Sequence, residues 1–436
     1  MNPYIQYMYS YPHKTAYRPL EGISLKEYAH LLAGSGHGLY LHIPFCQTKC
    51  GYCNLFSAAG HGEKEMDWYL DAVERQSSQY SELLGPYQPV FSEMIIGGGT
   101  PLLLTKKQLD RMFSMMENFF TFSKDRELVV ETAPNQTSKE KLEVLRQAGV
   151  TRVSMGIQSF SDGELAALGR GHRAQKAREA LALLKSFDFP CINVDFIYGI
   201  PGQTADSLLD SLKEALDFGP DEIFLYPLYV RHGVRLESEG IVPDGEAALE
   251  QYRRASGFLQ ERGYRQDSMR RFVKRREERA FSECGMGTSL ALGCGGRSYL
   301  GNLHFCTPYE VGGRECLEQI KRFEDTEDFT RIVHGIVLDE GEIKRRYVIR
   351  HLLIHPGLDA ERYEEHFKSR AMDDFPILSG WAEQGFLHGD RFLGLTEKGL
   401  EWSDYLGPKL ISPEIKKAMD EWEKQHSSVK GGRLSE

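Results

Sequence analysis

The sequence predicts an α/β fold, in which a partial (β/α)6 barrel is followed by a C-terminal helical or winged-helix-like domain. From residue 39 to about 230, short apolar runs alternate with segments of helical period. Repeated units of this kind form a parallel sheet with right-handed crossovers. Beyond about residue 330 the pattern changes to several helices around a small hairpin. The chain has 436 residues, 41% of them hydrophobic, which is enough for a large domain and a smaller one.

The apolar runs and their periods set the expected elements of the barrel. We expect strands at Leu39–Pro44, Val90–Ile96, Glu127–Glu131, Val150–Ile157, Cys191–Tyr198 and Glu222–Tyr229. We expect helices at Glu63–Leu84, Thr105–Phe119, Thr137–Ala148 and Asp206–Phe218. The third of these opens on a capping box, Thr137-Ser138-Lys139-Glu140. This number of βα units suits an open or partial barrel rather than a closed eight-fold one.

The same patterns divide the chain into regions. Residues 1–38 form an N-terminal segment, 39–235 the partial barrel, 236–329 a less regular region flanking the barrel on the substrate side, and 330–436 a winged-helix-like cap. In the cap we expect helices at Tyr347–Ile354, Asp359–Phe367 and Phe375–Gln384, a hairpin pairing Gly385–Leu387 with Phe392–Leu395, and a helix starting at Thr396. The polar end, Ser427–Glu436, is predicted to be mobile.

Composition excludes several classes of function. The net charge of −10 argues against broad nucleic-acid binding, and the cap has no basic recognition helix. No apolar stretch of roughly 18 residues exists, so no membrane span is expected. The N-terminus lacks the basic and apolar regions of a secretory signal. Eight cysteines in a chain of this size are not a disulfide framework, so we expect a protein of the reducing cytoplasm.

Three cysteines lie within a short run, Cys46-Gln-Thr-Lys-Cys50-Gly-Tyr-Cys53. They follow an expected strand and therefore lie on the loop at its C-terminal end. Thiolates this close together suit one soft multi-iron centre. A four-iron cluster needs one ligand per iron, so three cysteines leave one iron open for a substrate or cosubstrate. The alternative is a zinc site, but no second CxxC or His pair follows at the usual spacing.

Polar and glycine-rich motifs stand at the ends of the expected strands. They are Gly97-Gly98-Gly99-Thr100-Pro101, Glu131-Thr132, Gly156-Ile157-Gln158, and Asp195 with the later Tyr198–Gln203. The glycine triplet alone is a weak signal that an ordinary tight turn also explains. In parallel α/β sheets, however, chemistry gathers at the C-terminal ends of the strands. We therefore expect these side chains and the cysteine loop to share one site.

The CxxxCxxC motif with Tyr52 before its last cysteine resembles the radical S-adenosylmethionine (SAM) superfamily. The resemblance implies a [4Fe-4S] cluster held by Cys46, Cys50 and Cys53, whose open iron takes the amino and carboxylate groups of SAM. Electron transfer would then cleave SAM to methionine and a 5′-deoxyadenosyl radical. A flavodoxin- or ferredoxin-like protein is the expected electron donor. The catalytic residue that meets the substrate is left unassigned.

Further motifs resemble the oxygen-independent coproporphyrinogen III oxidase family. They are Tyr40–Cys46, Gly97–Pro101, Ser154–Phe160, Leu168–His172, Asp195–Pro201, Leu395–Leu400 and the N-terminal Tyr9–Pro12. This resemblance implies that Tyr40 and Tyr52 pack near SAM and that Gly98, Gly99, Thr100 and Glu131 contact it. It also implies that Gln158, Arg170 and Asp195 hold a second SAM or another occupant, so one or two SAM molecules are expected. The alternative for these last three is a buried polar network tying strand ends together.

One departure from the oxidase pattern affects the expected substrate. The true oxidases carry another cysteine two residues after the third, where this chain has Leu55. That form is closer to branches that act as haem chaperones, haem-cleaving enzymes or radical methyltransferases. The leading expectation is hydrogen abstraction from a porphyrinogen or related tetrapyrrole. The alternatives are a radical SAM methyltransferase or cyclopropanase that uses a second SAM, and a haem-binding chaperone on the same scaffold.

Two groups of residues outside these motifs have open interpretations. The stretch from Arg262 to Arg279 is rich in arginine and is either a solvated face or a source of guanidinium donors for substrate carboxylates. Arg170 is the other expected partner of such carboxylates. His42, just before the cysteine loop, is expected to make a structural hydrogen bond. The loosely spaced Cys284, Cys294, Cys306 and Cys316 are expected to be free buried thiols or an auxiliary site.

Overall fold

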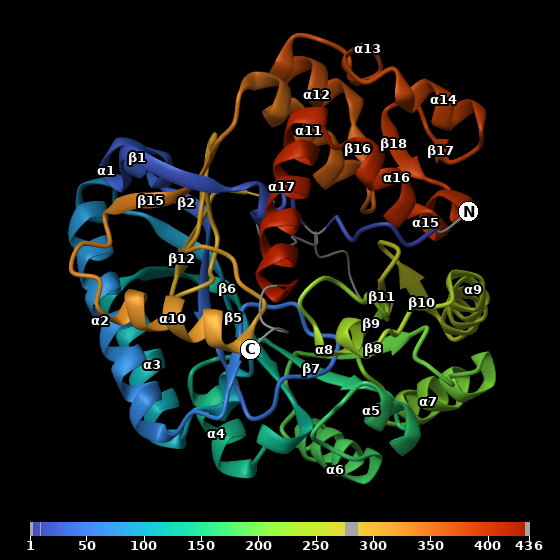
Figure 1. Ribbon diagram of the computed structural model, residues 1–436, viewed down its shortest axis with the longest axis horizontal. Coiled ribbons are helices and arrows are strands. Elements are labelled where there is room, and N and C mark those ends of the chain that lie inside the picture. Colours follow the sequence, from blue (N-terminus) through green and yellow to red (C-terminus); the bar gives the residue numbers. More distant parts are fainter. Residues whose placement is uncertain (1–2, 9, 275–286, 432–436) are drawn as a thin grey trace.

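A computed structural model describes residues 3–8, 10–274 and 287–431 of the chain. Its centre is a 13-stranded sheet in the order β1-β15-β14-β13-β12-β2-β5-β6-β7-β8-β9-β11-β10 (Figure 1). The strands from β2 to β9 lie in chain order and pair in parallel. Their bounds are β2 (Ser35–Ile43), β5 (Val90–Gly98), β6 (Thr121–Thr132), β7 (Arg152–Gln158), β8 (Cys191–Tyr198) and β9 (Glu222–Pro227). The predicted α/β fold with a partial parallel barrel is therefore confirmed.

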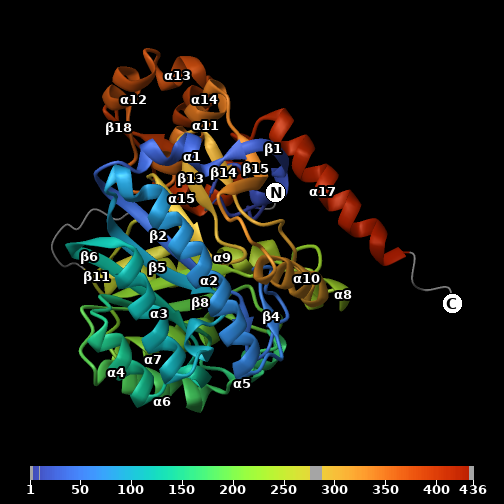
Figure 2. The same cartoon turned by 90° about the vertical axis from the view of Figure 1, so that its left-hand side faces the viewer.

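Helices pack along the outer side of these parallel strands (Figures 1 and 2). They are α2 (Glu63–Leu84), α3 (Lys106–Phe119), α4 (Lys139–Gln147), α5 (Asp162–Ala167), α6 (Ala174–Lys185), α7 (Ala205–Asp217) and α9 (Gly245–Glu261). The short α8 (Arg235–Ser238) lies instead at the cysteine loop, where the Leu236 N–H donates to Gly51 O. Helix α3 buries Leu109, Met112 and Met116, three or four residues apart, as an amphipathic helix requires. The predicted capping box at Thr137 is wrong, because the N-cap of α4 is Ser138 and its side chain makes no capping bond.

Short strands extend the sheet at both edges. One edge carries β12 (Ser289–Leu292), β13 (Ser298–Leu300), β14 (Leu303–Phe305), β15 (Arg331–Val337) and β1 (Arg18–Ser24), and the other carries β11 (Arg271–Lys274) and β10 (Tyr264–Gln266). Strand β12 pairs in parallel with β2, and the remaining added strands are antiparallel. The stretch expected to be less regular therefore contributes to both edges. Its strands of three or four residues are too short to show a period in the sequence.

The C-terminal part has its own hydrophobic core around a 3-stranded sheet, β16-β18-β17. Its elements are α11 (Glu340–Leu352), β16 (Leu358–Asp359), α12 (Ala360–Phe367), α13 (Ala371–Asp374), α14 (Ile377–Glu383), β17 (Leu387–His388), β18 (Phe392–Leu395), α15 (Glu397–Glu401), α16 (Ser403–Lys409) and α17 (Pro413–Gly431). The preceding helix, α10 (Gly313–Glu324), packs on α2 of the barrel. The expected hairpin is present, with Leu387 opposite Leu395. Met8, Tyr11 and Ala16 of the N-terminal segment join this core.

The last helix, α17, runs from the C-terminal part back toward the barrel (Figure 1). It packs against the 3-10 turn η1 (Lys14–Ala16) of the N-terminal segment. The remaining short elements are the helix α1 (Leu25–Tyr28), the paired strands β3 (Phe45–Cys46) and β4 (Ala58–Ala59), and the 3-10 turns η2 (Ala29–Leu32), η3 (Gly85–Tyr87), η4 (Pro101–Leu103) and η5 (Pro134–Gln136). Helix α17 continues beyond Ser427, where the sequence predicts a mobile end, and residues 432–436 lie outside the described part. Within the described residues, no helix has the length and apolarity needed to cross a bilayer.

Two arginines of the arginine-rich stretch are buried in ion pairs, whereas the side chains of Arg262 and Arg265 are 44% and 38% exposed. Arg270 pairs with Asp404 of α16, and Arg271 pairs with Glu222 and, at 2.7 Å, with Asp267. The Asp404 carboxylate also accepts a hydrogen bond from Tyr229, and its backbone oxygen accepts from Ile5 and Gln6. Neither expected role, a solvated face or a substrate site, fits Arg270 and Arg271. Arg275, Arg276 and Arg279 lie outside the described residues.

Substituting Asp404→Asn should lower the free energy of unfolding by about 3–5 kcal/mol, because it leaves the Arg270 guanidinium buried without its counter-charge. Urea denaturation followed by circular dichroism measures this change. The control is Glu401→Gln, which breaks the interdomain pair with Arg253, whose side chain is 55% exposed. That variant should lose less than about 1 kcal/mol. Equal losses in the two variants would contradict the assigned role of Asp404.

Candidate active site at the carboxyl ends of the strands

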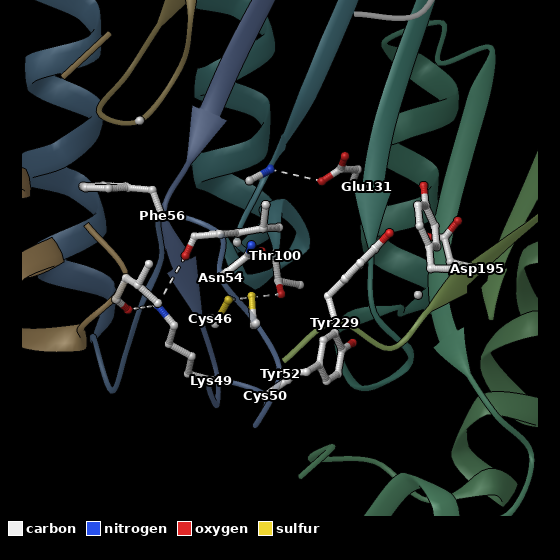
Figure 3. Close-up of a pocket in the computed structure, with 18 of the residues that line it drawn as sticks. Cys46, Lys49, Cys50, Tyr52, Asn54, Phe56, Thr100, Glu131, Asp195 and Tyr229 are labelled. Carbon is white, nitrogen blue, oxygen red and sulfur yellow. Dashed lines mark hydrogen bonds between the residues drawn. The ribbon is translucent and has the colours of Figure 1, made fainter. Parts of the chain in front are cut away.

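Every site residue predicted from the sequence lines one cavity of about 680 Å³ at the C-terminal ends of the parallel strands. These residues are Tyr40, Cys46, Cys50, Tyr52, Cys53, Gly98, Gly99, Thr100, Glu131, Gln158, Arg170 and Asp195. Figure 3 shows Thr100 beside the cysteines, with Glu131 and Asp195 projecting from strands of the sheet. The expectation that the strand ends and the cysteine loop share one site therefore agrees with the structure.

The cysteine loop is fixed on both sides by backbone contacts. The Gly51 N–H donates to Leu168 O at 2.9 Å, and Gly51 O accepts from the Leu236 N–H at 2.9 Å. A Cβ at Gly51 would lie 2.7 Å from Arg235 Nη2 and 3.2 Å from Leu168 O, so a larger residue would have to displace the Arg235 side chain. Lys49 Nζ closes the loop by donating to Ser57 O at 2.9 Å and to Val311 O at 2.6 Å. The loop thus has a defined shape before any ligand binds.

Two of the thiols have polar partners suited to thiolates. Arg170 Nη1 lies 3.1 Å from Cys50 Sγ, and Thr100 Oγ1 lies 3.8 Å from Cys46 Sγ. Burial raises the pKa of Cys46 to about 11 and also raises the pKa of Cys53. Buried thiols of this kind ionise when a metal centre brings positive charge to them. Donors aimed at the sulfurs from Arg170 and Thr100 would stabilise the resulting thiolates.

The donor set fits a multi-iron cluster better than a single ion. In the part of the chain that the structure describes, no three His, Cys, Asp or Glu side chains gather closely enough to hold one metal ion. A zinc ion requires all its ligands within about 2.3 Å of one point. A [4Fe-4S] cluster makes a different demand, because each cysteine binds a separate iron. Cys46, Cys50 and Cys53 on one short loop meet that demand.

The glycine loop after β5 approaches the cysteine loop closely. The Gly99 N–H donates to Ile43 O and the Thr100 N–H to Phe45 O, both at 2.8 Å. A Cβ at Gly98 would lie 2.6 Å from the His42 ring, and Gly98 has a φ of +113° that favours glycine. His42 Nε2 donates to Phe56 O at 2.8 Å. The structural hydrogen bond expected for His42 is confirmed.

Two acidic side chains face the cavity from β6 and β8. Burial, with a smaller contribution from Asp195, raises the pKa of Glu131 to about 7, although the Gly98 N–H donates to its Oε2 at 3.0 Å. Burial raises the pKa of Asp195 to about 6, although Asn193 Nδ2 donates to it at 2.7 Å. Carboxyl groups with pKa values near neutrality are common in functional sites. A cationic ligand would favour their ionised forms.

Gln158 and Arg170 occupy the end of β7. Gln158 has a φ of +72°, a strained conformation for a residue other than glycine. Arg170 Nη2 donates to Gly156 O at 2.6 Å, while its other terminal nitrogen lies against Cys50. Arg170 therefore connects a strand end to the cysteine loop. This contact agrees with the second interpretation of Arg170, a buried polar network. It also lines the cavity, so the two roles are compatible.

Several cavity residues were missed by sequence reasoning. They come from the N-terminal segment, β9 and its following loop, β13, the loop before α10, and α17, and they include Lys14, Tyr226, Tyr229, Arg231, Arg297, Tyr299, Tyr309 and Trp422. The rings of Tyr309 and Trp422 stack with centroids 5.3 Å apart, and Lys14 Nζ lies 3.8 Å above the Tyr309 ring. These residues are spread over several distant segments of the chain, so no single local motif groups them.

Comparison with known proteins identifies the class to which this site belongs. Residues 40–215 match the model of the radical SAM superfamily, and the match contains the cysteine loop and the polar strand ends. These residues therefore form a radical SAM domain. Such a domain implies a [4Fe-4S] cluster and SAM, and the cysteine loop described above fits such a cluster.

Within this superfamily the similar proteins are named for two activities. The heme chaperone HemW of Mycobacterium tuberculosis (strain CDC 1551 / Oshkosh) is 33% identical over 240 residues, which is 53% of this chain and 61% of that protein. The heme chaperone HemW of Bacillus subtilis (strain 168) is 28% identical over 83% of this chain and 95% of its own length. The oxygen-independent coproporphyrinogen III oxidase of Escherichia coli (strain K12) is 25% identical over 83% of this chain and 82% of its own length.

The fold has a close counterpart among solved structures. Coproporphyrinogen III oxidase (HemN) from Escherichia coli aligns with a TM-score of 0.79 at 24% sequence identity, over 95% of this chain and 97% of that one. At this identity the likeness concerns the fold alone. It includes both the barrel and the C-terminal helical part, as the sequence predicts.

Substituting Cys50→Ala should abolish the visible charge-transfer absorbance of the anaerobically reconstituted protein, because one iron of the cluster would lose its protein ligand. Iron and sulfide analysis with absorbance spectroscopy measures the change. Cys191→Ala is the matched control, since Cys191 lies at the start of β8 and does not line the cavity. A Cys50→Ala protein with full cluster content would show the ligand assignment to be wrong.

Binding of SAM should strengthen as the pH rises through 6 to 7 and level off above that range. The ionised forms of Asp195 and Glu131 would attract the positive sulfonium group of SAM, and their pKa values are about 6 and about 7. Affinity at pH 6 should be roughly tenfold lower than at pH 8. Calorimetric titration of the reconstituted protein measures it.

The control for this titration is Glu131→Gln, which keeps an oxygen acceptor for the Gly98 N–H but does not ionise. Its affinity should be lower at pH 8 and should vary less between pH 6 and pH 8. An unchanged pH profile in this variant would exclude Glu131 as the titrating group.

Proposed function

We propose that this protein is a radical SAM enzyme that abstracts hydrogen from a porphyrinogen or a related tetrapyrrole. The observation that carries the proposal is that one cavity contains both the cysteine loop with its polar strand ends and a separate wall of aromatic and cationic side chains. The first set suits the cluster and SAM, and the second suits a flat, carboxylate-bearing macrocycle.

The chain's own residues have distinct tasks in this proposal. Cys46, Cys50 and Cys53 hold the cluster. When bound, the reduced cluster and SAM supply a carbon radical that can remove hydrogen from a substrate. Gly98–Thr100 and Glu131 bind SAM, through backbone groups and a carboxylate. The surrounding residues exclude water from the reaction, since the cavity is covered by α17 and the N-terminal segment.

The substrate class is supported by the second wall of the cavity and by the relatives. The rings of Tyr226, Tyr229, Tyr299, Tyr309 and Trp422 line the cavity, and aromatic faces pack well against a planar macrocycle. Relatives are named as coproporphyrinogen oxidases and heme chaperones. Both names refer to a tetrapyrrole. We further infer a flavodoxin- or ferredoxin-like electron donor and a cytoplasmic location, because a reduced cluster needs a reducing compartment.

Haem chaperone activity is the second candidate. Leu55 stands where the oxidase pattern has a further cysteine, and it is 44% exposed at the edge of the cavity. Two of the relatives, at 33% and 28% identity, are named heme chaperones. In such a protein the tetrapyrrole would be bound and released without being changed.

Radical methyl transfer is a third candidate and rests on a different observation. Gln158, Arg170 and Asp195, the residues assigned by resemblance to a second SAM, line the same cavity as the cysteine loop. A second SAM there could donate a methyl group to a substrate radical. Cyclopropanation of a substrate would use the same arrangement.

Anaerobic incubation of the reconstituted protein with SAM, a reductant and a tetrapyrrole should release 5′-deoxyadenosine. Liquid chromatography with mass spectrometry separates the candidates. Carbon dioxide from coproporphyrinogen supports oxidation, S-adenosylhomocysteine supports methyl transfer, and stoichiometric haem binding without turnover supports the chaperone. Failure to form 5′-deoxyadenosine with an intact cluster would contradict both enzymatic candidates.

A further inference from the structure

Positive side chains gather on one part of the cavity wall. Lys14, Arg231 and Arg297 line the cavity, and Arg346 of α11 lies behind them. The guanidinium carbons of Arg297 and Arg346 lie 5.7 and 5.2 Å from the ring centroid of Tyr299, which also lines the cavity. These cations come from the N-terminal segment, the loop after β9, β13 with its preceding loop, and α11. Only the folded chain brings them together.

The electrostatic potential at this wall is positive. Burial, and then the charges of Arg350 and Arg297, lower the pKa of Arg346 to about 10. Burial lowers the pKa of His304 well below its usual range, and Arg346 and Arg297 lower it further. The pKa of His13 is lowered by burial and then by Lys14, Arg297 and Arg231. Several charges of one sign thus act on the same small volume, which favours an anionic ligand.

Polar atoms beside this wall have unused hydrogen-bonding capacity. The Tyr17 hydroxyl and both ring nitrogens of His304 find no hydrogen-bond partner among the described residues, although these side chains are only 2% and 1% exposed. Buried polar groups in folded proteins are nearly always bonded. His304 pairs across the sheet with Tyr299, and their rings lie 4.8 Å apart. The unbonded atoms therefore lie directly behind a residue of the cavity wall.

The two arginine sites expected from the sequence are already engaged. Arg270 is buried against Asp404, and Arg271 against Asp267 and Glu222. Arg170 spans Cys50 and Gly156 on the SAM side of the cavity. A substrate carboxylate at Arg170 would compete with the ligands of that side. Lys14 and Arg297 line the cavity from the N-terminal segment and from the loop before β13.

We propose that Arg297 and Lys14 bind a carboxylate of the substrate, with Arg346 adding positive charge behind them. The carboxylate is that of a tetrapyrrole side chain, so this inference rests on the proposed function. Anchored there, the macrocycle lies against Tyr299 and Tyr309. Arg297 and Lys14 are positioning residues in this arrangement and determine which edge of the substrate faces SAM.

The experiment compares coproporphyrin III with its tetramethyl ester, which has the same macrocycle and no negative charge. Fluorescence titration of the full-length reconstituted protein in the presence of SAM measures both affinities. Wild-type protein should bind the acid at least about tenfold more tightly than the ester. Arg297→Met should weaken binding of the acid by about tenfold or more and leave binding of the ester unchanged. Arg253→Met, at an exposed arginine outside the cavity, is the control.

The outcomes separate this inference from the proposed function. If Arg297→Met weakens binding of the acid and the ester equally, or leaves both affinities unchanged, the proposed carboxylate site is wrong. The proposal that the protein binds tetrapyrroles would still hold. Wild-type protein that binds neither compound overturns the proposed function and this inference with it. Iron content reports whether the variant is folded. If Arg297→Met does not fold, the affinities for the acid and the ester are compared in Lys14→Met instead, because Lys14 lies in the separate turn η1.

Discussion

The close contact between the glycine loop after β5 and the end of β2 is the constraint on which the site depends. Hydrogen bonds from Gly99 and Thr100 to Ile43 and Phe45 hold the two loops together at 2.8 Å. A Cβ at Gly99 would lie 2.5 Å from Phe45 O, so no larger residue allows this approach. The contact places the cysteines next to the strand ends that carry Thr100 and Glu131. It also explains why three adjacent glycines follow a buried strand.

The C-terminal part and the N-terminal segment complete the cavity that the barrel leaves open. The buried pair of Arg270 and Asp404 fixes α16 against the sheet edge at β11, and the Asp404 backbone holds the N-terminal segment in the same place. From there η1 and α17 reach the cavity, where Lys14 and Trp422 meet at Tyr309. The Tyr309 hydroxyl donates to Asn54 O at 2.5 Å, directly after the last cysteine. The covering elements and the cysteine loop are thus one connected structure.

Local patterns were enough to predict the barrel and the SAM side of the site. Apolar runs located the strands, and glycine, acid and cysteine motifs at their ends located Cys46, Gly98, Glu131 and Asp195, because parallel strands bring their C-terminal ends to one edge. The opposite wall could not be predicted in this way. Lys14, Arg297 and Trp422 lie far apart in the chain, and their meeting depends on β12 pairing with β2 and on α17 returning to the barrel. The role of Arg270 and Arg271 could not be predicted for the same reason. Their partners Asp404 and Glu222 are distant in sequence.

The two walls of the cavity carry different charged groups. The strand ends present carboxyl groups, Glu131 and Asp195, toward the region where the positive groups of SAM are expected. The other wall presents Lys14 and Arg297, with Arg346 behind. Carboxyl groups therefore line one part of the cavity and cationic groups another. Burial strengthens their effect on a charged ligand, because charges interact more strongly away from water. A substrate with carboxylates on its rim would be turned so that its uncharged carbons face the cluster.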